Sequence, residues 1–361
     1  MRFVSPALKH FVFPLLSRTG YLRRAVGTGP AVVTYHGVFP SGYQILSPAL
    51  DGNLVSAESL SRQLMLLKSR YHVISPDEFL HWIDGEIQLP DRSVLLTCDD
   101  ALRNTLTEML PILSKLDLRC LFFATGASLA PSPSMLWYEE LFLMLLEAAP
   151  PFTLSLPEGG VEVTAAAVDE KLRRWWDIVE RLSRFEMETR REFLDRTRLQ
   201  LNLPATWRER FIGDPALASR FLTLDLAGLR QLVAAGMTIG AHSLSHPVLA
   251  CAPSDLAWRE ISDGRRQLEN ALQQTVWAFG FPFGNASTVT PREVELADRA
   301  GFRCAFTNVG GGFGAPIARL AVPRVHVTAD MGLPEFEAHL TGFYRSLRKQ
   351  LLGVDEAAMG A

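Results

Sequence analysis

Short apolar runs alternate with amphipathic segments over two parts of the chain, 29–130 and 223–345. The apolar runs predict buried strands, and they cover 31–38, 73–74, 94–97, 119–124, 237–241, 277–281, 303–307 and 324–327. The amphipathic segments predict helices at 56–70, from 75 onward, and at 106–116, 226–235, 256–272, 291–300 and 333–352. Strands that alternate with helices are typical of parallel α/β folds, so we predict a barrel-like α/β domain.

This alternation stops between 131 and 222. Residues 153–163 resemble a hairpin, and 171–201 is a charged stretch that we expect to be helical. We therefore predict a mostly helical insertion, in which Trp175 and Trp176 either pack internally or line a sugar cleft. The remaining segments are expected to be an N-terminal helical arm, 1–28, and a C-terminal tail, 346–361.

Composition narrows the possible partners and compartment. The 361 residues are 48% hydrophobic and 21% charged, and the net charge of −3 argues against nucleic-acid binding. The four cysteines form no C-x-x-C pair, which predicts neither a disulfide framework nor a thiolate zinc site. With no standard secretory signal, we expect a cytoplasmic protein. Residues 1–25 mix apolar and basic side chains, which fits either a packed helix or peripheral contact with the inner membrane face.

Two adjacent acids, Asp99 and Asp100, end the apolar run 94–97. Neighbouring residues on a strand point to opposite faces, so both acids can serve one site only where the strand ends. Active sites of α/β barrels lie at that end of the strands. Two carboxylates side by side are also unfavourable unless a cation offsets them or one is protonated.

The pair His242 and His246 offers a site for such a cation. Two imidazoles with one carboxylate, and positions left for water, describe a catalytic Zn²⁺-type site. The zincin motif is excluded because it requires Glu directly after the first histidine, where this chain has Ser243. A general base must then come from elsewhere, and the acid pair at 99–100 is the natural source.

Three motifs together resemble the polysaccharide deacetylases. They are Thr97-Cys98-Asp99-Asp100, His242-Ser243-Leu244-Ser245-His246 and Phe279-Gly280-Phe281-Pro282-Phe283-Gly284, in the order that family has them. The segment Thr34-Tyr35-His36-Gly37-Val38 is similar to the same group. The resemblance covers about 29–130 and 225–330 and implies a distorted (β/α) barrel that removes N-acetyl groups from a sugar polymer with a divalent metal, Zn²⁺ being favoured.

The resemblance also implies roles for individual residues. Asp99 would be the general base, while Asp100, His242 and His246 would hold the metal. Backbone groups at Pro282 and Phe283 would line the sugar cleft and help to stabilise the oxyanion. His326 is the candidate general acid because it ends a late strand, with a structural role beside Arg324 as the alternative. His36 is a candidate substrate-binding residue because it ends the first strand.

The chain departs from the family pattern in three places. Phe283 stands where tyrosine is common, and Gly280-Phe281 stand where an arginine often precedes the prolines and orients the base. Thr307-Asn308 occupies the region of a fourth motif that is not apparent.

We therefore expect a metal-dependent N-deacetylase acting on an N-acetylated polysaccharide or a lipid-linked sugar, as in exopolysaccharide biosynthesis. The alternatives are a barrel that binds glycan without turnover and a hydrolase of another non-peptide C–N amide bond.

Overall fold

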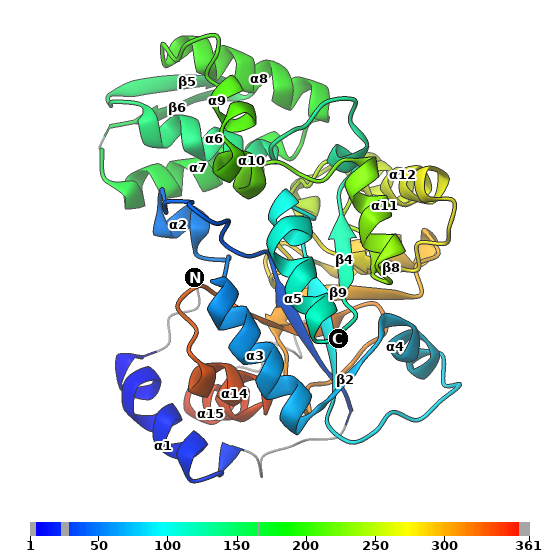
Figure 1. Cartoon of the computed structure of the whole chain (residues 1–361). Coiled ribbons are helices and arrows are strands. Elements are labelled where there is room, and N and C mark those ends of the chain that lie inside the picture. Colours follow the sequence, from blue (N-terminus) through cyan, green and yellow to red (C-terminus); the bar gives the residue numbers. More distant parts are fainter. Residues whose placement is uncertain (1–4, 23–28, 165, 354–361) are drawn as a thin grey trace.

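A ring of parallel strands forms the centre of the computed structural model, which describes residues 5–22, 29–164 and 166–353 (Figure 1). Neighbouring strands follow the order β2-β3-β4-β7-β8-β9-β10-β1, and β1 also pairs with β3, which closes seven strands into a barrel and leaves β2 outside. The barrel strands are β1 Ala31–Tyr35, β3 Ser93–Cys98, β4 Leu121–Ala124, β7 Thr238–Ala241, β8 Ala278–Gly280, β9 Cys304–Gly310 and β10 Val322–His326, with β2 at His72–Ile74. The predicted barrel is therefore confirmed.

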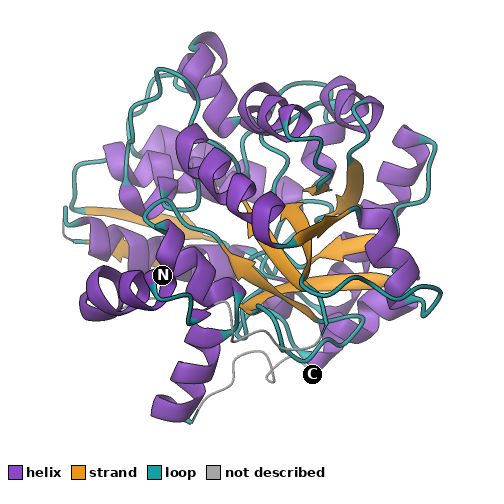
Figure 2. Cartoon of the chain, turned by 60° about the horizontal axis from the view of Figure 1, so that its bottom comes forward, coloured by secondary structure: helices purple, strands orange, loops and turns teal. Residues whose placement is uncertain are grey.

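Helices surround this barrel (Figure 2). They are α3 Ala57–Arg70, α4 Pro76–Ile83, α5 Leu110–Lys115, α11 Leu226–Ala234, α12 Ser254–Leu272, α13 Pro291–Arg299, α14 Leu333–Leu340 and α15 Phe343–Leu352. Short turns complete the connections: α2 Pro48–Asp51, η3 Thr105–Met109, η4 Gly126–Leu129 and η5 Leu249–Cys251. The single helix predicted at 333–352 is wrong, because Gly342 adopts φ of 72° and separates α14 from α15.

Alternation along the strands divides the core into two layers. One side of each strand faces the helices, for example Val33, Leu96 and Phe122. The other side fills the barrel interior with a small cluster that includes Val32, Leu95, Leu121, Phe123, Phe306 and Val322. Side chains that continue this inward set emerge at the carboxyl ends of the strands.

The segment 131–222 forms a separate layer over those carboxyl ends (Figure 1). It contains α6 Trp137–Glu147, the hairpin β5 Phe152–Leu156 and β6 Gly159–Val163, then α7 Val168–Leu182, α8 Met187–Gln200, α9 Glu209–Gly213 and α10 Pro215–Phe221. It has its own hydrophobic core. The stretch 171–201 is helical as predicted, and a turn at 183–186 divides it between α7 and α8.

A buried ion cluster ties this layer to the loop after β1. Arg220 is fully buried, and its guanidinium contacts Asp51 at 2.7 Å and Glu139 at 2.9 Å. Replacing Arg220 with methionine would leave two buried carboxylates without their cation. We expect this to cost about 3–5 kcal/mol of unfolding free energy, measured by denaturant titration. Arg191→Met, at an exposed position of the same layer, is the matched control and should change stability by less than about 0.5 kcal/mol.

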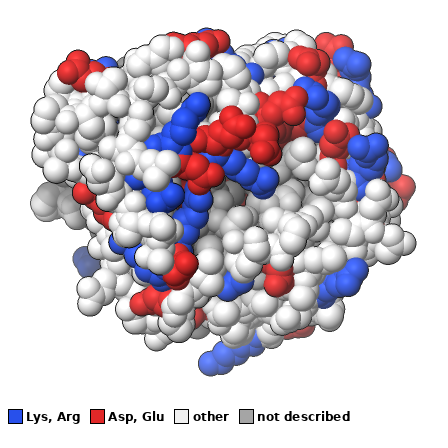
Figure 3. Space-filling view, turned by 90° about the horizontal axis from the view of Figure 1, so that it is seen from above, with Lys and Arg blue, Asp and Glu red and all other residues white. Residues whose placement is uncertain are grey.

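Charged side chains on the outer face of this layer are mixed in sign (Figure 3). Arg173 and Arg174 pair with Glu170, and Arg208 pairs with Glu140 and Asp195. Basic and acidic side chains are therefore interspersed on this face and do not form one broad basic field.

The N-terminal segment packs against the C-terminal helices. It contains η1 Leu8–Val12 and α1 Phe13–Arg18, and Phe13 is buried against Tyr344. Phe11 and Leu15 stay exposed. Within the described residues, none of the helices has the length and apolar character needed to span a bilayer. All four cysteines are free thiols, and three of them are buried.

Candidate metal centre and active site

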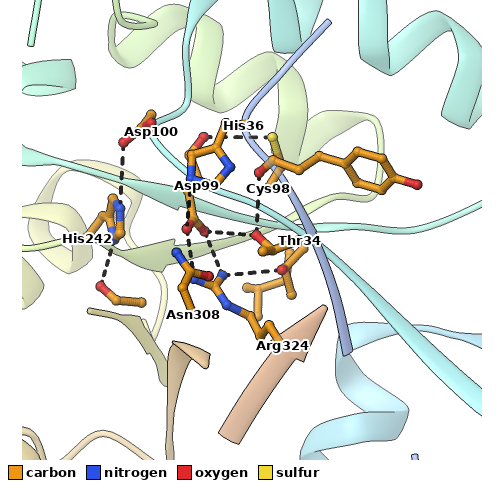
Figure 4. Close-up of polar contacts among 12 residues, drawn as sticks. Thr34, His36, Cys98, Asp99, Asp100, His242, Asn308 and Arg324 are labelled. Atoms are coloured by element: carbon orange, nitrogen blue, oxygen red, sulfur yellow. Dashed lines mark hydrogen bonds and ion pairs between the residues drawn. The ribbon is translucent and has the colours of Figure 1, made fainter. Parts of the chain in front are cut away.

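Strand ends bring the candidate residues together at the mouth of the barrel (Figure 4). Asp99 follows the inward-facing Leu95 and Thr97 of β3, and His242 directly follows β7. Asp100 would point away on a continuing strand, but its φ of 70° ends the strand and turns the chain. Both carboxylates therefore reach one site, as predicted from their position at the end of an apolar run.

Asp100, His242 and His246 form a buried cluster whose potential ligand atoms lie within 4.8 Å of one another. Asp100 Oδ1 lies 3.4 Å from His246 Nε2 and 3.6 Å from His242 Nε2. Ligands held at about 2.1 Å in a tetrahedral arrangement are separated by about 3.4 Å, so these distances suit one shared ion. Asp100 Oδ1 is also buried without a hydrogen-bond partner among the described residues, which fits an atom that binds a cation.

The hydrogen bonding of His242 prepares it for this role. Its Nδ1 lies 2.7 Å from the carbonyl oxygen of Gly280, which places the proton on Nδ1 and leaves the Nε2 lone pair facing Asp100. Burial lowers the pKa of His242 to about 4, so the imidazole is neutral at pH 7. A neutral imidazole oriented through a backbone carbonyl is the form in which histidine binds metals.

The two histidines are joined by a tight loop rather than by a helical turn. Ser243 and His246 both adopt left-handed φ angles, of 62° and 56°. The Ser243 hydroxyl accepts a hydrogen bond from the His246 backbone N–H at 2.9 Å. The loop thus turns both imidazoles toward Asp100, and its strained residues indicate that the surroundings hold its shape.

Asp99 is set apart from the cluster by a bidentate ion pair with Arg324. The guanidinium of this fully buried arginine contacts the two carboxylate oxygens at 2.6 and 2.7 Å. Burial raises the pKa of the Asp99 carboxyl, but Arg324 and the nearby imidazoles outweigh burial and hold that pKa well below its usual range. Asp99 is therefore an ionised acceptor beside the cluster.

Arg324 was not predicted as a functional residue. Gly280, one of the two residues where the family often has an arginine, has no room for a side chain: a Cβ there would lie 3.1 Å from His242 Nδ1 and 2.9 Å from the Phe123 ring. Arg324 reaches Asp99 from β10 instead, where a bulge between Pro323 and Arg324 shifts the register. The only signal in the sequence is a charged residue inside an apolar strand, which must be paired if it is buried.

The turn after β8 places a free backbone donor beside the site. Phe283 has φ of 60°, and the Gly284 N–H bonds to the Pro282 carbonyl at 2.6 Å. The backbone N–H of Phe283 has no acceptor among the residues that the structure describes. This N–H, the donor predicted to stabilise the oxyanion, is therefore not engaged by another group of the described chain.

Aromatic side chains of the insertion continue the site wall. The Phe283 ring lies 4.8 Å from the His246 ring, 5.1 Å from the Tyr138 ring and 5.2 Å from the Trp176 ring, between ring centroids. Trp175 contacts both Tyr138 and Trp176. The tryptophan pair therefore packs within the insertion and also borders the site. Tyr138 was missed because nothing local in the sequence connects it to His246.

His36 and His326 lie together on the other side of Asp99. Their ring centroids are 4.7 Å apart, and Thr34 and His326 are register partners on β1 and β10. His36 Nε2 lies 3.7 Å from Asp99 Oδ2, and its buried Nδ1 has no hydrogen-bond partner among the described residues. The structure thus gathers all the candidate residues around one mouth.

Comparisons with known proteins show a partial match to one family model and a shared fold. The family model described as "Polysaccharide deacetylase" matches residues 212–305, a segment that contains both histidines of the buried cluster. No curated protein sequence matches the chain.

Several solved structures share its fold. The deacetylase PplD of Streptococcus pyogenes, in complex with acetate, is 16% identical, with a TM-score of 0.53 over 87% of this chain and 99% of that one. IcaB from Ammonifex degensii is 18% identical, with a TM-score of 0.52 over 88% and 98%. A de-N-acetylase from Aggregatibacter actinomycetemcomitans is 14% identical, with a TM-score of 0.51 over 86% and 99%. The chain is therefore similar to the polysaccharide deacetylases over residues 212–305, and it shares the fold of these solved structures.

Proposed function

We propose that this chain is a metal-dependent carbohydrate N-deacetylase whose ion is held by Asp100, His242 and His246 and whose general base is Asp99. One observation carries the proposal. Three buried ligand atoms converge with metal-like spacing, and Asp99 lies beside them with Arg324 as its partner. The match of residues 212–305 to the polysaccharide deacetylase family model supports the reaction class.

The residues divide the chemistry among themselves. A bound divalent ion would act as a Lewis acid, polarising the amide carbonyl and lowering the pKa of water. Asp99, kept ionised by Arg324, accepts a proton from the attacking water. The Phe283 N–H donates to the carbonyl oxygen as negative charge develops on it. The amine then leaves with a proton from an imidazole.

His326 and His36 both lie where they can supply that proton. His326 was the predicted donor, and His36 is favoured by its Nε2, which lies 3.7 Å from Asp99. Replacing the true donor with glutamine should lower the rate on an N-acetyl sugar by about 10²–10⁴-fold. The loss should be much smaller on an acetate ester, whose leaving group needs less protonation. Comparing His36→Gln with His326→Gln on both substrates identifies the donor, and equal losses on amide and ester in both variants would contradict this role.

The proposal also names Zn²⁺ as the metal and an N-acetylated polysaccharide or a lipid-linked sugar as the substrate. One carboxylate and two imidazoles are donors that suit Zn²⁺. An N-acetylated polysaccharide or a lipid-linked sugar fits a mouth bordered by aromatic rings, which stack on sugars. The exposed Phe11 and Leu15 favour contact with the inner face of a membrane by a cytoplasmic protein. Phe13 is buried and so takes no part in that contact.

Metal analysis combined with an acetate assay tests the proposal. The purified protein should hold about one Zn²⁺-class ion, release acetate from N-acetylglucosamine oligomers and lose activity with a chelator. Oligosaccharide binding without acetate release under any metal would favour the glycan-binding alternative. Release of ammonia or another amine from non-sugar amides, without acetate, would favour the other hydrolase.

A further inference from the structure

Residues of the insertion form hydrogen bonds with the loop 242–248, which carries the two proposed metal ligands His242 and His246. The indole N–H of Trp137 on α6 donates to the carbonyl of His246 at 3.1 Å. The hydroxyl of Ser183, after α7, accepts from the Val248 N–H at 2.9 Å. Together with Arg190 of α8, these residues reach the loop from three successive helices of the insertion. The histidine loop is therefore surrounded by residues of the insertion as well as by residues of the barrel.

Arg190 is the centre of these contacts. It is fully buried, and one guanidinium nitrogen donates to the Ser245 hydroxyl at 2.8 Å. The others donate to the carbonyls of Leu182 and Phe185, and the guanidinium lies over the Trp137 ring, 5.1 Å from its centroid. An arginine with this many fixed contacts holds its neighbours in one arrangement.

Glu260 connects the same network to the barrel. This buried carboxylate of α12 accepts from the Ser245 backbone N–H at 2.8 Å and also contacts the Ser245 hydroxyl. Arg190 lies 3.6 Å from it. Ser245, one residue before His246, is thus held between a cation from the insertion and an anion from the barrel.

We infer that Arg190 is a positioning residue for the metal centre, acting through Ser245 and Glu260 to keep the histidine loop in its ligand-binding shape. The inference rests on the proposed function and assigns the insertion a part in metal affinity. The loop contains two residues with left-handed φ, which persist only when their surroundings impose them. Without Arg190 the loop can relax, and His246 must be repositioned each time an ion binds.

Metal affinity of the full chain tests this inference without any deacetylase assay. Chelator-treated parent, Arg190→Met and Arg190→Lys proteins are titrated with Zn²⁺ against a competing chromophoric chelator. Removing groups that orient metal ligands weakens binding by about 10–100-fold, which we expect for Arg190→Met, with partial rescue by lysine. The Co²⁺ absorption spectrum should change as well, since it reports ligand geometry.

Two further variants keep the result interpretable. Ser245→Ala removes only the hydroxyl between Arg190 and Glu260, and we expect it to weaken Zn²⁺ binding about tenfold. If Arg190→Met does not fold, this variant tests the inference in its place. Arg208→Met removes an arginine of the insertion whose partners, Glu140 and Asp195, do not touch the loop, and should bind Zn²⁺ like the parent. A parent that binds no metal would refute the proposed function. A parent that binds tightly, with Ser245→Ala and Arg190→Lys binding equally tightly and giving unchanged Co²⁺ spectra, would refute only the inference.

Discussion

Asp99→Asn is expected to lose acetate-releasing activity by about 10²–10⁴-fold while still binding one metal ion. The asparagine has nearly the same shape but cannot accept the proton of the attacking water. Metal binding should survive because the three ligand atoms belong to Asp100, His242 and His246, and Asp99 is oriented by Arg324 instead. Steady-state acetate release and metal stoichiometry on the same preparation measure both parts.

Asp100→Asn is the matched control for this prediction. It makes the same chemical change one residue further along, at a predicted ligand, and should lose metal affinity together with activity. If Asp99→Asn keeps activity within threefold of the parent, or loses its metal as Asp100→Asn does, the assignment of base and ligand is wrong.

The barrel and much of its site could be predicted because their signals are local. The run 94–97 followed by two acids marked the end of β3, and the side-chain period of two required the chain to turn there. The same reasoning placed His242 after β7. Each of these inferences needs only neighbouring residues and the rule that chemistry gathers at the carboxyl ends of parallel strands.

The partners of these residues could not be predicted, because they come from distant elements. Arg324 is 225 positions from Asp99, and Arg190 is 55 positions from Ser245. In the sequence, each is a basic residue in a strand or in a charged helix, where exposure on the surface is the ordinary expectation. Arg324 becomes buried only when the barrel closes, and Arg190 only when the insertion packs against the barrel.

The division between α7 and α8 shows the same limit on a smaller scale. The charged pattern of 171–201 continues through the turn, so helical periodicity did not reveal it. Within the turn, the Ser183 hydroxyl accepts a hydrogen bond from the Val248 N–H and the Phe185 carbonyl accepts one from Arg190. These are tertiary contacts that override local preference.

Arg324→Met is expected to shift the acid side of the pH–activity profile to higher pH and to lower the maximal rate. In the parent, Arg324 opposes the effect of burial and keeps the pKa of Asp99 below its usual range, so the base stays ionised even in mild acid. Without the guanidinium, burial raises that pKa, and the carboxyl must lose its proton at a higher pH before it can act. The measurement is kcat against pH at saturating metal, and an unchanged acid limb would contradict the role given to Arg324.

The same substitution separates electrostatics from simple packing. Because the folded-state pKa of Asp99 is depressed, the pair contributes stability that is present above the ordinary carboxyl range and is lost only as pH falls below it. Arg324→Met leaves Asp99 buried without its guanidinium partner, so we expect a loss of about 3–5 kcal/mol at pH 7 that shrinks as Asp99 protonates in acid. Arg324→Lys keeps the positive charge but not the bidentate contact. Its acid limb should therefore lie at a pH between those of the parent and of Arg324→Met. A packing role alone would lower stability equally at every pH and would leave the pH profile of both variants in place.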